Sequence, residues 1–88
     1  MEVVYLTSFL KDLKKIKDKK TLVRVKALLL DLKSVNDVDK IKHVKKLKGH
    51  PFAYRIRIGD YRIGIYCSEG VIKVARFVKR NDIYKLFP

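Results

Sequence analysis

Residues Tyr54–Tyr66 read YRIRIGDYRIGIY, with apolar and polar side chains alternating at a period of two on both sides of Gly59-Asp60. This pattern is typical of a β-hairpin closed by a two-residue loop. If Gly59 and Asp60 form the loop, the apolar side chains of the two strands all lie on one face of the hairpin. The facing pairs on that side are Ile58 with Tyr61, Ile56 with Ile63, and Tyr54 with Ile65.

The opposite face of this hairpin carries three arginines. The same register sets Arg57 across from Arg62 and Arg55 across from Gly64. Like charges directly opposite each other destabilise a strand pair. The cluster, beside a glycine that leaves room, therefore favours an anion-binding site, and the alternative is a solvated outer sheet face.

The composition indicates one strongly basic domain. The chain has 88 residues, 22 Lys and Arg against 9 Asp and Glu, and a formal net charge of +13. A single domain over residues 1–88 is expected, with one modest core. Such a charge attracts nucleic acid, an anionic membrane surface or an acidic protein.

Neither a membrane nor an oxidising compartment is indicated. The longest apolar run, Ala27–Leu30, is far too short to span a bilayer, so no membrane partner is expected. The first residues lack the basic and long apolar regions of a signal peptide. The single cysteine, Cys67, cannot form an internal disulfide. A cytoplasmic location is therefore expected.

The remaining chain predicts a small α+β domain in the order β-α-α-β-β-β. A two-helix hairpin is expected to pack on a four-stranded, mostly antiparallel sheet, with the first strand pairing in parallel after the helical crossover. A hydroxyl of Thr7 or Ser8 is expected to cap the first helix, and the charged residues of that helix, Asp12 among them, are expected to face solvent. The expected strands cover residues 2–6, 53–58, 61–67 and 71–78, the helices run from about 9 to 17 and from about 20 to 35, and a loop with one helical turn covers 79–88.

Two acids, Asp37 and Asp39, lie in the polar loop after the second expected helix. Their spacing suits a cation, but no third oxygen ligand and no set of His and Cys accompanies them. A role in turning the chain is the better interpretation. We expect neither a metal site nor a cofactor.

Three segments together resemble the RelE/ParE superfamily of toxins from bacterial and archaeal toxin–antitoxin pairs. They are Leu47-Lys48-Gly49, Tyr54–Ile63 with its Tyr-Arg-x-Arg-x-Gly-Asp-Tyr-Arg pattern, and Val78–Tyr84 with Arg-x-x-x-Tyr. The resemblance covers essentially the whole chain and is closer to the RelE-like messenger-RNA interferases. It implies a ribosome-dependent endoribonuclease that inhibits translation.

The resemblance also implies residue roles. Two basic residues of the second family strand fall on Arg55 and Arg57, a third-strand arginine on Arg62, a basic residue after the last strand on Arg80, and a near-terminal tyrosine on Tyr84. The implied reaction is metal-independent attack of a ribose 2′-hydroxyl on the adjacent phosphate. Arg57, Arg62 and Arg80 would stabilise the developing charge, and Tyr84 would stack on a base or orient the hydroxyl.

The chain departs from the family where protons must move. Some relatives carry lysines where this chain has Arg55 and Arg57, and an arginine is a poor proton acceptor. Others use a Glu and a His, but the residue before Arg80 is Lys79. His50, Lys48 and Lys79 remain open candidates for proton transfer. Together with Arg55, these three residues are expected to contact RNA.

Two alternative functions remain: a ParE-like inhibitor of DNA gyrase that is not a nuclease, and a non-catalytic, toxin-like RNA-binding protein. The basic strand cluster with Arg80 and Tyr84 favours the nuclease. The expected partners are the ribosome, messenger RNA and a cognate acidic antitoxin. A flexible segment of the antitoxin is expected to pack on the sheet or the helices and to cover or distort the basic face.

Overall fold

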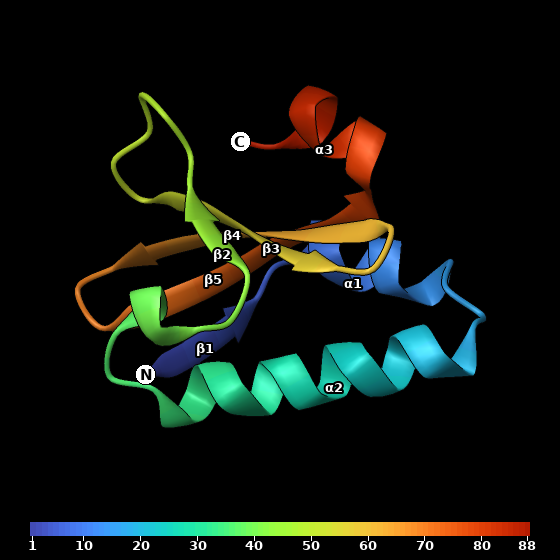
Figure 1. Cartoon of the computed structure of the whole chain (residues 1–88), viewed down its shortest axis with the longest axis horizontal. Coiled ribbons are helices and arrows are strands. Elements are labelled where there is room, and N and C mark those ends of the chain that lie inside the picture. Colours follow the sequence, from blue (N-terminus) through green and yellow to red (C-terminus); the bar gives the residue numbers. More distant parts are fainter.

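A five-stranded mixed sheet crosses the molecule in the order β1-β5-β4-β3-β2, with β1 parallel to β5 and every other pair antiparallel (Figure 1). The computed structural model describes all residues, 1–88. The elements are β1 (Glu2–Tyr5), α1 (Thr7–Lys14), α2 (Lys19–Ser34), the 3-10 helix η1 (Val38–Lys40), β2 (Val44–Lys46), β3 (Ala53–Ile58), β4 (Tyr61–Ser68), β5 (Val71–Lys79) and α3 (Arg80–Leu86).

The expected α+β class and the parallel first strand are confirmed, but the sheet has five strands rather than four. The additional strand is β2, which pairs with β3 at the sheet edge. It comprises only three residues, too few to show the alternation by which the other strands are recognised. The C-terminal segment also differs from the expected loop and single helical turn, because α3 is a helix of seven residues.

The central hairpin has the expected register. Ile58 pairs with Tyr61, Ile56 with Ile63, and Arg57 with Arg62. The loop glycine, Gly59, has a φ of 55°, a conformation that glycine adopts without strain. The apolar side of the hairpin is therefore one wall of the main core, as the alternation predicts.

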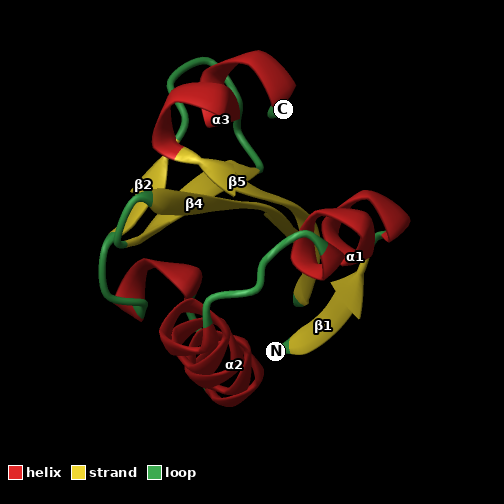
Figure 2. Cartoon of the chain, turned by 90° about the vertical axis from the view of Figure 1, so that its right-hand side faces the viewer, coloured by secondary structure: helices red, strands yellow, loops and turns green.

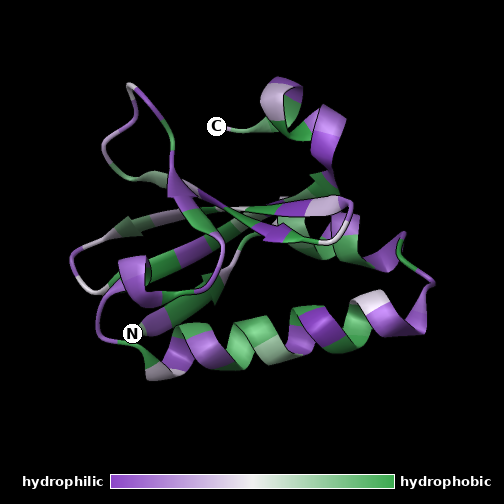
Figure 3. Cartoon of the chain, viewed as in Figure 1, coloured by the Kyte–Doolittle hydropathy of each residue, from purple (hydrophilic) through white to green (hydrophobic).

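Helices cover the two sheet faces unequally. In Figure 2, α2 lies below the sheet, α1 lies beside β1, and α3 lies above the sheet. The main core fills the space between the sheet and α2, where Val25, Leu28 and Leu32 are buried. Hydrophilic residues interrupt α2 along its length (Figure 3), and none of the helices combines the length and apolarity needed to cross a bilayer.

Helix α1 completes an otherwise open edge of β5. β1 pairs only with Val71–Val74 of β5, so the rest of that strand has no strand partner on this side. The Ser8 hydroxyl donates to the Ala75 carbonyl at 2.6 Å, and the Asp12 carboxylate accepts from the Phe77 amide at 2.9 Å. Side chains of α1 thus replace the missing strand partner.

This role corrects two expectations for α1. Neither Thr7 nor Ser8 caps the helix, because the cap residue is Leu6 and it makes no side-chain cap hydrogen bond. Asp12, expected to face solvent, is 5% exposed. Arg76 donates to both of its carboxylate oxygens, at 2.8 and 3.0 Å. Asp12 is therefore buried because it hydrogen-bonds to the part of β5 that β1 leaves unpaired.

Replacement of Asp12 by Ala should lower the free energy of unfolding by about 2 to 3 kcal/mol, because the Phe77 amide and the Arg76 guanidinium lose a charged acceptor. Urea unfolding followed by circular dichroism measures this change. Asp31→Ala, on the exposed surface of α2, is the matched control and should stay within about 0.5 kcal/mol of the parent. Equal effects of the two substitutions would contradict the role of Asp12.

Candidate functional site

Three arginines line one shallow cavity on the open side of the central hairpin. The cavity has a volume of about 270 Å³ and is lined by His43, Val44, Lys45, Arg55, Arg57 and Arg62. No acidic residue lines it, and the only salt bridge in the protein joins Asp12 to Arg76 elsewhere. The arginine pocket, as we call this cavity, therefore holds positive charge that no carboxylate neutralises.

Arg62 is held in place by the hairpin turn. Its Nη1 donates to the Gly59 carbonyl at 3.0 Å and to the Tyr61 carbonyl at 2.9 Å. Burial, followed by the positive charges of Arg57, Arg80 and Arg55, lowers the pKa of Arg62 from its ordinary value. A guanidinium nevertheless stays protonated in proteins. A bound anion would relieve this repulsion.

Helix α3 brings an aromatic ring to the pocket. The guanidinium carbon of Arg55 lies 4.9 Å from the centroid of the Tyr84 ring, within cation–π distance. The Tyr84 side chain is 68% exposed, so much of the ring is available to a ligand. At its start the helix is fixed by the Arg80 amide, which donates to the Asp60 carbonyl at 2.8 Å.

The expected RNA-contacting residues separate into neighbouring hollows. A groove of about 460 Å³ contains Lys48, His50 and Tyr84, and it shares Arg55 with the arginine pocket. Lys79 and Arg80 line another hollow of about 440 Å³ together with Asp60. The structure therefore brings Arg55, Arg57 and Arg62 together. It places Tyr84, Lys48 and His50 beside them, and Lys79 and Arg80 outside the pocket.

The space above Gly64 is not an anion site, contrary to the sequence interpretation. The Phe87 ring occupies it, and a Cβ built on Gly64 would lie 2.5 Å from Cγ of that ring. Phe87 also packs against Tyr66, with ring centroids 5.0 Å apart. Together with the buried Ile83, Phe87 anchors α3 on the sheet and so positions Tyr84 over Arg55.

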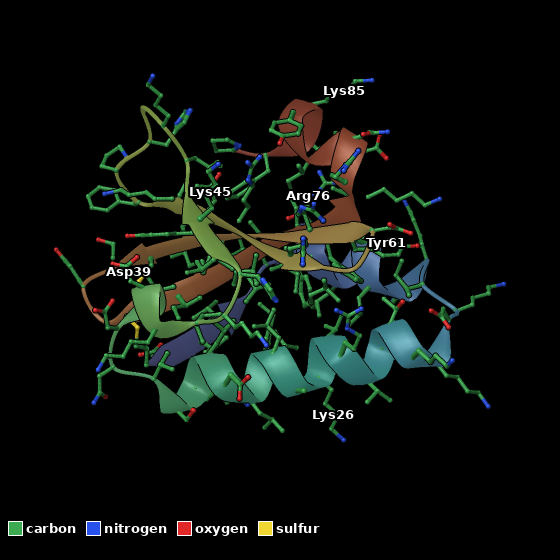
Figure 4. The ribbon with its side chains drawn as sticks, in the orientation of Figure 1. Lys26, Asp39, Lys45, Tyr61, Arg76 and Lys85 are labelled. Carbon is green, nitrogen blue, oxygen red and sulfur yellow. The ribbon has the colours of Figure 1, made fainter.

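Two polar residues of the pocket, Lys45 and His43, are not among the site residues expected from the sequence. Lys45 pairs with Arg55 across β2 and β3, and Figure 4 shows it on β2, whereas Lys26 projects from α2 away from the sheet. Recognition of β2 would have revealed Lys45. His43 precedes this strand and has a φ of 65°, which is uncommon for a residue other than glycine.

The two loop acids lie at the start of η1. The Asp37 side chain accepts from the Asp39 amide at 2.9 Å and caps η1, in line with the expected role in turning the chain. No group of three or more His, Cys, Asp or Glu side chains with metal-binding geometry occurs in the protein.

Known proteins resemble the chain over its full length. It is 36% identical to Toxin RelE3 of Methanocaldococcus jannaschii, with 100% of both chains covered. Its fold matches a chain of the RelB–RelE antitoxin–toxin complex from Methanococcus jannaschii with a TM-score of 0.82 and 33% identity. The match covers 97% of this chain and 99% of the matched chain. The archaeal RelE–RelB complex from Pyrococcus horikoshii matches with a TM-score of 0.74, 25% identity, and 90% and 93% coverage. No protein-family model matches the chain.

Gly64→Ala should displace the Phe87 ring and loosen α3. We expect the free energy of unfolding to fall by about 1 to 3 kcal/mol, as in other overpacked cores. Amide hydrogen exchange of Ile83–Phe87 should accelerate, because the helix loses its anchor. Chemical denaturation and exchange measured by NMR test the two effects.

The matched control is the same substitution in a Phe87→Ala background. The three atoms nearest to a Cβ at residue 64 all belong to that ring, so without it Gly64→Ala should have little effect on stability. The same loss in both backgrounds would show that contact with Phe87 is not the reason for the glycine.

Proposed function

The chain belongs to the RelE family of toxins, and from this membership we propose that it is the toxin of a type II toxin–antitoxin pair that cleaves messenger RNA on the ribosome. The observation that carries this proposal is the arginine pocket, whose Arg55, Arg57 and Arg62 have no carboxylate partner. Guanidinium groups match the oxygens of phosphate and can bind them in pairs. The pocket is thus suited to the phosphodiester backbone of RNA.

The proposed reaction is attack of a ribose 2′-hydroxyl on the adjacent phosphate. Charge develops on the phosphorane oxygens in the transition state, and donors already fixed in place stabilise it most effectively. Arg62 is such a donor, because the turn carbonyls hold its guanidinium. Arg57 faces it across the strands, and Arg80 begins α3 beside the same turn. The reaction uses no metal in this proposal, since the guanidinium groups provide the positive charge.

Tyr84 gives the site a surface for a nucleobase. Its ring is mostly exposed and lies against Arg55. Stacking of a base on such a ring typically contributes ~1–3 kcal/mol. Lys48 and His50 line the adjoining groove and would follow the RNA backbone away from the pocket. Ribosomal RNA would hold the message so that the reacting atoms meet, which lowers the entropic part of the barrier.

The proposed partner is an acidic antitoxin. The Methanococcus jannaschii and Pyrococcus horikoshii neighbours are complexes of RelE with RelB, and the present chain carries a net charge of +13. A partner of opposite charge associates rapidly with such a surface. An antitoxin segment over the arginine pocket would exclude RNA from it.

Arg57→Ala should reduce cleavage of a ribosome-bound message by about 100-fold or more, the usual effect of removing one donor to a transition-state anion. The side chain is exposed and makes no hydrogen bond within the protein, so folding should not suffer. Toe-printing in a translation system of purified components measures the cleavage. Lys26→Ala, which removes a cation from the outer surface of α2, is the matched control and should leave cleavage unchanged.

Two outcomes would contradict the proposal. An intact message accompanied by inhibited DNA supercoiling would favour a gyrase inhibitor. A similar loss of activity for Arg57→Ala and Lys26→Ala would mean that net charge, rather than the arginine pocket, determines the effect.

A further inference from the structure

The arginine pocket contains one side chain of a type that serves enzymes as a proton acceptor. Its other basic groups are the guanidinium groups of Arg55, Arg57 and Arg62 and the ammonium of Lys45. A guanidinium does not deprotonate in proteins, and an ordinary lysine is protonated at pH 7. An ordinary imidazole titrates near pH 6.5. The imidazole in the pocket is that of His43.

The strand register places His43 beside Arg57. Val44 pairs with Ile56 and Lys45 with Arg55, so the next position along the two strands sets His43 opposite Arg57. The Arg57 amide donates to the His43 carbonyl at 3.3 Å, which continues the ladder by one step. His43 is exposed, and therefore a ligand in the pocket can reach it.

The backbone of His43 is held in an unusual conformation. Its φ of 65° lies in the left-handed region, which non-glycine residues adopt mainly where the surrounding structure requires it. Such positions are concentrated at functional sites. Here the turn before β2 carries the imidazole to the edge of the arginine pocket.

We propose that His43 is the proton acceptor of the RNA-cleavage reaction. The neutral imidazole takes the proton of the 2′-hydroxyl as the 2′-oxygen bonds to phosphorus, and the bond from phosphorus to the 5′-oxygen breaks. The leaving 5′-oxygen takes a proton from water. The products are a 2′,3′-cyclic phosphate and a 5′-hydroxyl, and the imidazolium returns its proton to solvent. This inference rests on the proposed nuclease function.

The three residues that the sequence suggests for proton transfer lie farther from the proposed phosphate position. His50 and Lys48 line the groove next to Tyr84, and Lys79 lines the hollow beside Asp60. None of them lines the arginine pocket, where the phosphate would bind. The charged residues that line the pocket with His43 are Lys45 on β2, Arg55 and Arg57 on β3, and Arg62 on β4, all of them cationic. His43 is therefore the residue that combines the position with the chemistry.

The test is the pH dependence of single-turnover cleavage on programmed ribosomes, for the intact chain and for His43→Asn. Asparagine tolerates a positive φ, so the variant keeps the backbone while losing the titratable ring. The parent rate should rise with pH and then level off, because only the neutral imidazole accepts a proton. His43→Asn should cleave about 100-fold more slowly or worse and lose this rise. Its thermal unfolding midpoint should match that of the parent.

His50→Asn, which replaces the other histidine of the chain, is the reference for pH effects on the ribosome and should retain the rise. If His43→Asn cleaves at the parent rate, or if the rise persists in it, His43 is not the proton acceptor while the nuclease function stands. If the parent chain leaves the message intact at every pH, the nuclease function is wrong and the role of His43 falls with it.

Discussion

The antiparallel register of β3 and β4 determines both what this protein buries and what it presents. Because the strand period is two, the turn at Gly59 puts Ile56 and Ile63 into the core and Arg57 opposite Arg62 on the other face. A slip of one residue would exchange the two faces. The core therefore requires the same register that sets two like charges opposite each other, and no carboxylate in the protein offsets their repulsion.

The parts of the fold that the sequence predicts are those set by local patterns. The hairpin has alternating strands and a two-residue glycine loop, and both its register and its faces follow from them. β2 could not be predicted in this way, because three residues are too few to show a period. Asp12 could not be placed either, since its burial depends on Arg76 and Phe77, more than sixty residues away along the chain.

In the candidate site, too, some features follow from local sequence patterns and others from contacts between distant segments. The positions of Arg55 and Arg57 follow from the strand alternation, but the use of the space over Gly64 does not, because Phe87 reaches it only after α3 folds back onto the sheet. A glycine among arginines suggests room for a ligand, whereas here it allows the helix that carries Tyr84 to dock. The position of Tyr84 over Arg55 thus depends on the apolar contact between Phe87 and the sheet.

The central claim, that RNA phosphate binds in the arginine pocket, is tested most directly by NMR of the arginine Nε–H groups. A 3′-phosphorylated ribonucleotide is added to the isolated chain. If phosphate binds in the pocket, the signals of Arg55, Arg57 and Arg62 should shift with one common dissociation constant. The signal of Arg76, whose guanidinium is already bound by Asp12, should not move. Shifts of equal size in all four arginines, or none in the pocket, would contradict this claim.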